Sequence, residues 1–137
     1  MPLPARLFCD TSFFYACLDL NDANHGRAQE LNDEAAAFDV GFFTTWDVVS
    51  GTVTLLRYRK GFQSAMAFLE EVKPDLHIVE YGQGVRVEAE KIFRLRGRSR
   101  RISFCDAVSF VVVTTLLDHM PSLSFDRDFR ALGLTVL

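Results

Sequence analysis

The sequence predicts an α/β fold of three layers, in which a parallel sheet of short strands is covered by helices on both faces. Short apolar runs alternate with longer segments of helical periodicity along the chain, as expected of repeated strand–helix units. The runs lack polar residues at every second position, which indicates strands that are buried on both faces. A length of 137 residues fits one domain that spans residues 1–137.

The first half of the chain begins with a strand and continues mainly with helices. The first apolar run ends at Asp10, and Thr11 and Ser12 are good residues to begin a helix. Gly61 separates two later helices, and Pro74 is expected to end the second of them. The expected elements are a strand at 7–9, helices at 13–18 and 25–38, a strand at 42–44, and helices at 45–60 and 62–73.

The second half contains the longest apolar helix of the chain. Gly97 closes a preceding amphipathic helix, and Gly133 separates the last two elements. The expected elements are a strand at 76–79, a helix that includes 85–93, a helix at 104–117, a strand at 123–125, a helical turn through 129 and a last strand at 134–137. We find no repeat, low-complexity tract or linker.

Composition and charge exclude several classes of protein. The net charge of −3 is mildly acidic, so nucleic-acid binding would need a local basic patch. Three cysteines without metal-ligand spacing argue against both a disulfide framework and a zinc site. The start lacks the features of a signal peptide, and the longest apolar stretch, at 107–117, is too short to span a membrane. We therefore expect a cytoplasmic protein without a membrane association.

Three aspartates occupy positions that suit a metal site. Asp10 and Asp126 each follow an apolar strand, and ligands of open α/β sheets bind beyond the carboxyl ends of the strands. Asp106 lies in the first turn of an apolar helix. Three carboxylates at one point would raise one another's pKa values, and a divalent cation would remove that cost. Oxygen ligands favour Mg2+ or Mn2+ over zinc. The structural alternative is that each aspartate only caps a helix or complements its dipole.

Four motif-like segments follow one another in order and cover nearly the whole chain: FCDTSFFYACLD, TTWDVVSGTVTLLRYRKG, ISFCDAVSFVVV and SFDRDFRALG. These segments resemble motifs of the PIN domain family and of its VapC-like toxins. The resemblance implies a PIN-like fold and a Mg2+-dependent ribonuclease that cuts RNA endonucleolytically. It also implies the toxin role in a toxin–antitoxin pair. The expected partners are an RNA substrate and a cognate antitoxin, and the expected assembly is a homodimer.

The resemblance also assigns roles to individual residues. By motif, the catalytic residues and metal ligands would be Asp10, Asp106 and Asp126. Ser12 and Ser124 would orient these carboxylates, or they would serve only in capping and turn formation. Asp128 could be an auxiliary ligand, although a solvated turn is the alternative.

One position departs from the family pattern. The family has a glutamate in the second motif, and Gly51 stands there in this sequence. Glycine within a helix costs roughly 1 kcal/mol relative to alanine, so no helix-forming reason favours it. Engineered inactivation or natural drift toward weak activity would explain the replacement. Asp47, four residues earlier and on nearly the same helix face, could substitute through a bridging water.

A basic segment precedes Asp106 and is the candidate RNA-binding patch. Its members are Arg94, Arg96, Arg98, Arg100 and Arg101. These arginines could hold phosphates on either side of the cleaved bond, or they could form a solvated charged loop. Two other functions remain open: a non-catalytic PIN module that binds RNA or an antitoxin, and a phosphoacceptor domain that uses Asp10.

Overall fold

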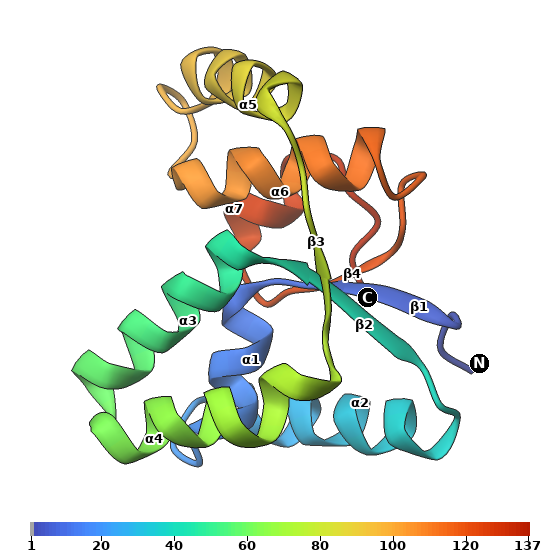
Figure 1. Ribbon diagram of the computed structural model, residues 1–137, viewed down its shortest axis with the longest axis vertical. Coiled ribbons are helices and arrows are strands. Elements are labelled where there is room, and N and C mark those ends of the chain that lie inside the picture. The colour runs from blue at the N-terminus through green and yellow to red at the C-terminus, as the bar shows by residue number, and fades with distance from the viewer. Residues whose placement is uncertain (1) are drawn as a thin grey trace.

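The computed structural model describes residues 2–137 and forms one parallel sheet with helices on both faces (Figure 1). The strands are β1 (Arg6–Cys9), β2 (Gly41–Thr45), β3 (His77–Val79) and β4 (Ser122–Leu123). Their order in the sheet is β3-β2-β1-β4, and every neighbouring pair is parallel. The α/β fold class predicted from the sequence is confirmed.

The chain reverses its direction across the sheet at β1. It moves from β1 through β2 to β3, and β4 then pairs with the opposite side of β1. Right-handed crossovers put the helices of these two halves on opposite faces of the sheet. One face carries α1 (Thr11–Leu18), α2 (His25–Ala37), α3 (Trp46–Arg59) and α4 (Phe62–Ala67), and the other carries α5 (Gln83–Arg96), α6 (Phe104–Thr115) and α7 (Arg127–Arg130) (Figure 1). A crevice is expected where the order reverses, between the carboxyl ends of β1 and β4.

Two apolar clusters hold the layers together. The larger cluster joins the sheet to α1–α4 and buries large rings, among them Phe8, Phe13 and Phe68. The smaller cluster joins α5 to α6 through residues such as Ala89 and Val112. Burying a large apolar side chain contributes roughly 1.5–3 kcal/mol, so these clusters fix where the first turns of α1 and α6 lie.

Three predicted elements end elsewhere than expected. The helix expected at 62–73 is α-helical only to Ala67, and a π-helical turn (Phe68–Val72) and a 3-10 turn (Lys73–Asp75) follow it. Pro74 does not end the helical segment at residue 73, because it lies in the first turn of the 3-10 helix, where its missing N–H is not needed. The apolar helix ends at Thr115 rather than at 117, and strand β4 ends at Leu123 rather than at 125.

The last predicted strand is reduced to a single bridge. Val136 pairs with Ser122 in parallel, and no longer ladder forms at 134–137. β4 itself has only two residues, so it offers a partner few backbone groups to pair with. Within residues 2–137, no helix is both long enough and apolar enough to cross a membrane.

Candidate active site

Two serines join the ends of β1 and β4. The Ser12 hydroxyl accepts a hydrogen bond from the backbone N–H of Phe125 (2.9 Å), and the Ser124 hydroxyl accepts one from the N–H of Asp126 (3.1 Å). The backbone N–H of Asp10 donates to the Leu123 carbonyl at 3.1 Å. These bonds place the residues that follow the two strands side by side.

The same serines hold the Asp10 carboxylate. Ser12 and Ser124 each donate to Oδ2 of Asp10 at 2.9 Å. Their two hydroxyl oxygens are 3.2 Å apart, but each hydroxyl has one proton and gives it to the carboxylate, so this contact is not a third hydrogen bond. Burial raises the pKa of Asp10, and the hydrogen bonds from Ser124 and Ser12 oppose that rise. The predicted orienting role of the serines thus agrees with their contacts, and their turn-forming role is present as well.

Asp106 is both a helix cap and a member of the acidic group. Its backbone N–H donates to the Ser103 hydroxyl (3.0 Å), and its Oδ2 accepts from the Ser103 N–H (2.9 Å), which completes a capping box at the start of α6. Burial and, to a smaller extent, the charges of Asp10 and Asp126 raise the pKa of Asp106 to about 6, although the hydrogen bonds with Ser103 oppose the rise. One carboxylate oxygen serves the cap, so the other remains as a ligand atom.

Asp126 follows β4 by three residues and begins the short helix α7. Its Oδ1 accepts the backbone N–H of Asp128 at 2.8 Å. Asp128 contributes this backbone donor, and its carboxylate is not part of the acidic group formed by the three predicted aspartates. The capping role is therefore present in the structure, and it occupies one of the two carboxylate oxygens of Asp126.

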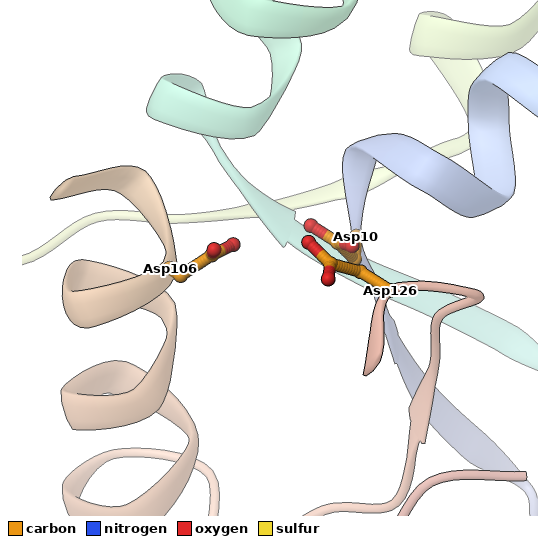
Figure 2. A group of neighbouring side chains, drawn as sticks. All are labelled: Asp10, Asp106 and Asp126. Carbon is orange, nitrogen blue, oxygen red and sulfur yellow. The ribbon is translucent and has the colours of Figure 1, made fainter. Parts of the chain in front are cut away.

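The three predicted aspartates meet at one point. One carboxylate oxygen from each of Asp10, Asp106 and Asp126 lies within 4.8 Å of the others. Figure 2 shows the Asp106 carboxylate extending from α6 toward the pair formed by Asp10 and Asp126. Asp10 and Asp106 are 4% and 5% exposed. Buried, mutually repelling carboxylates are the donor set that a hard divalent cation fits, because its charge removes the repulsion.

Gly51 lies beside this group, across from the start of α1. A Cβ atom added at Gly51 would lie 3.7 Å from Oγ1 of Thr11, an ordinary contact, and Thr11 directly follows Asp10. Thr52 fixes this arrangement, because its hydroxyl donates to the Val48 carbonyl (2.7 Å) and lies 3.4 Å from the Thr11 hydroxyl. A side chain at this position would therefore begin in ordinary van der Waals contact with the residue that follows Asp10.

Asp47 is held by a contact that the sequence did not indicate. The Tyr81 hydroxyl donates to Oδ2 of Asp47 at 2.6 Å. Asp47 is outside the group of three aspartates, although it lies close enough to Cys105 to help raise the pKa of that thiol, which burial raises to about 12. The bond with Tyr81 joins residues 34 positions apart, so local sequence patterns carried no signal for it.

The predicted basic patch is exposed, and a second basic cluster, which consists of Arg57, Arg59 and Lys60, is exposed as well but contacts neighbouring side chains. All five arginines from Arg94 to Arg101 are exposed, and none forms an ion pair within residues 2–137. In the other cluster, Arg57 stacks on Phe62, and Lys60 forms an ion pair with Asp19 at 3.4 Å. The arginines at 94–101 are therefore exposed cations without an ion-pair partner among the described residues.

Comparison with known proteins identifies the family. The model of the PIN domain family matches residues 7–134. The chain belongs to the PIN domain family. It is 32% identical over 127 residues to the 23S rRNA-specific endonuclease VapC20 of Mycobacterium tuberculosis, covering 93% of this chain and 94% of that protein. It is 29% identical over 123 residues to a VapC ribonuclease of Archaeoglobus fulgidus, covering 88% of this chain and 76% of that protein.

A solved structure of this family has the same fold. The crystal structure of Mycobacterium tuberculosis VapC20, described as a toxin that cleaves the sarcin-ricin loop, superimposes with a TM-score of 0.79 at 29% identity. The match covers 94% of this chain and 96% of that chain. The resemblance drawn from the four sequence motifs is confirmed, and these PIN domain relatives are named as ribonucleases.

Proposed function

We propose that this PIN domain, spanning residues 1–137, is a metal-dependent endoribonuclease and the toxin of a toxin–antitoxin pair. The observation that carries the proposal is the group of three aspartates, whose carboxylate oxygens lie within 4.8 Å of one another near the carboxyl ends of β1 and β4. The ribonuclease names of the VapC relatives support the RNA substrate. We further propose a cytoplasmic location, a cognate antitoxin and a homodimer, as the family resemblance implies.

The side chains would divide the work as follows. Asp10, Asp106 and Asp126 would hold Mg2+ or Mn2+, and Ser12 and Ser124 would keep the Asp10 carboxylate ionised and aimed at the metal. When bound, such an ion neutralises the negative charge that develops on a phosphodiester during hydrolysis. The exposed arginines of the segment 94–101 would bind phosphates on either side of the cleaved bond.

Gly51 favours a second candidate function. Without a fourth carboxylate, the site could bind RNA or an antitoxin without cutting, as a non-catalytic PIN module. The two functions differ in a measurable way: the first requires cleavage that depends on a divalent metal, and the second predicts binding without cleavage.

The test places a glutamate, the residue expected from the family pattern, at position 51. Gly51→Glu is compared with Gly51→Gln, which has the same length without the charge, and with the original protein. We expect Gly51→Glu to bind Mg2+ more tightly and to cleave an RNA pool faster than both others. It should also be less stable than Gly51→Gln without metal, because a fourth carboxylate adds repulsion.

The outcomes separate the candidates. Equal cleavage by all three proteins would mean that Gly51 is no defect and that another residue completes the site. Cleavage that persists in Asp106→Asn would contradict the three-aspartate site. If no protein cleaves RNA or responds to Mg2+, the non-catalytic function is correct.

A further inference from the structure

An exposed pair of aromatic rings lies between α5 and the start of α6. The rings of Phe93 and Phe104 meet edge to face, with centroids 5.6 Å apart and an interplanar angle of 68°. They nevertheless remain 41% and 47% exposed. Single exposed apolar residues are ordinary on a protein surface, but two large rings in contact form an apolar surface that suits a ligand.

The pair forms the wall of an open groove with a basic rim. The groove has a volume of about 640 Å³, within the range of small-molecule sites. It is lined by Glu90, Phe93, Arg94, Gly97, Arg98 and Phe104. Arg94 and Arg98 are exposed and form no ion pair within residues 2–137, so two cations face one acid. The groove therefore offers both a stacking surface and free positive charge.

We propose that this groove binds one unpaired base of an RNA, with Arg94 and Arg98 on the phosphates beside it. The proposal rests on the proposed ribonuclease function, whose substrate it specifies as single-stranded at this position. Unpaired bases stack on aromatic rings, while guanidinium groups bind phosphates and also stack. A base inside a duplex cannot reach the rings, because its faces are already stacked on its neighbours.

The position of the groove tells which nucleotide it would hold. Phe104 and Asp106 are two residues apart on α6, hence about 200° apart around the helix axis. Asp106 extends toward Asp10 and Asp126 (Figure 2), whereas Phe104 contacts α5. A helix with its side chains is roughly 10–12 Å wide. The bound base would therefore belong to a nucleotide on the other side of α6, about one helix width or more from the acidic group.

The site is also held in place by its surroundings. Ile102, in the loop between Arg98 and Phe104, is only 6% exposed and anchors that loop. The capping box of Ser103 and Asp106 fixes the first turn of α6, on which Phe104 lies. The same turn therefore positions a ring in the groove and a carboxylate in the acidic group, which couples recognition of a base to the cleavage site.

The test uses a short single-stranded RNA with 2-aminopurine at one position, whose fluorescence falls when it stacks on a ring. The full-length protein is titrated in EDTA, which prevents cleavage. Phe104→Leu keeps the apolar contact with Phe93 but removes the stacking ring, and Phe104→Tyr restores a ring. Phe38→Leu, at a residue that is 65% exposed and follows α2, is the matched control.

We expect Phe104→Leu to weaken binding by roughly five-fold or more and to abolish the quenching, as loss of one stacked base requires. Phe104→Tyr and Phe38→Leu should bind and quench as the original protein does. A duplex of the same sequence should bind equally to all four proteins. Unchanged binding by Phe104→Leu would overturn the proposal.

Two further results distinguish this proposal from a protein–protein interface and from the proposed ribonuclease function. If Phe104→Leu leaves RNA binding intact and instead changes the sedimentation of the protein, the groove is an interface between protein chains and the proposal is wrong. If the quenching depends on Phe104 but Gly51→Glu never cleaves RNA, the base site stands and the proposed ribonuclease function fails.

Discussion

Replacing Asp106 by asparagine should make the metal-free protein more stable at neutral pH. The asparagine would keep the shape of the side chain and an oxygen that can accept the Ser103 N–H of the capping box. The change removes a buried negative charge that lies near Asp10 and Asp126. The substitution therefore separates the cost of that charge from the value of the helix cap.

The magnitude follows from the pKa of Asp106. Burial raises it from 3.8 to about 6, and at 1.36 kcal/mol per unit this difference corresponds to about 3 kcal/mol at most. Between pH 4 and 6 the folded protein holds a proton that the unfolded chain has already lost. The free energy of unfolding contributed by this group therefore falls as pH rises through that window and is constant above about pH 7. The Asp10 pKa is also raised, so this residue adds a slope of the same sign.

The assay is urea unfolding followed by circular dichroism, at several pH values between 4 and 7.5 in EDTA. We expect Asp106→Asn to be more stable than the original protein by about 1–3 kcal/mol at pH 7, with the difference vanishing near pH 4. Asp75→Asn, at an exposed position, should show no such difference. Mg2+ should stabilise the original protein by mass action and leave Asp106→Asn nearly unchanged. An Asp106→Asn protein that is less stable at pH 7 in EDTA would refute the reasoning.

Three other variants, one of them a double substitution, test the sheet and the surroundings of the site. Ser124→Ala removes a hydrogen-bond donor to Asp10 and the acceptor of the Asp126 N–H. It should lower the free energy of unfolding in urea at pH 7 by about 1–3 kcal/mol and raise the Mg2+ concentration at which stabilisation by the metal is half-maximal. An unchanged half-maximal Mg2+ concentration would contradict the role of Ser124. Thr44→Val loses the 2.8 Å hydrogen bond to the Cys9 carbonyl while keeping the shape of the side chain; it should cost about 1 kcal/mol, which denaturation at constant m-value would measure. Replacing Arg100 and Arg101 by glutamine should weaken binding of single-stranded RNA and lower the slope of log affinity against log salt by about 0.7 for each phosphate that is no longer neutralised, whereas an unchanged slope would exclude this pair from the patch.

The sequence predicted the acidic site well because each aspartate follows a strong local pattern. Asp10 follows an apolar strand, and Asp106 begins an apolar helix behind a serine. Strand direction then determines that residues after β1 and β4 share one edge of the sheet. The pattern did not reveal that Asp106 and Asp126 would each cap a helix and also belong to the acidic group, because that depends on the angle between two elements.

The errors lie where local patterns compete with tertiary contacts. The π-helical turn after Ala67 keeps Phe68 fully buried against the core, which helical periodicity could not reveal. The strand expected at 134–137 has a two-residue neighbour, and the length of that neighbour is set by the turn toward Asp126. Similarly, Tyr81 and Asp47 meet only because β3 lies beside β2 in the sheet.

The hydrogen bonds of Ser12 and Ser124 make the acidic group depend on two segments that lie far apart in the sequence, the one after β1 and the one after β4. The side-chain hydrogen bonds between these segments join residues that are 113 and 114 positions apart, so they form only after a long loop of chain has closed. A partly folded chain in which the segment after β4 has not yet paired with β1 has Asp10 and Asp106 but lacks the Asp126 carboxylate, and Asp10 then keeps the Ser12 hydrogen bond without the one from Ser124. The acidic group is therefore assembled only when the segment that follows β4 has folded against the end of the first strand.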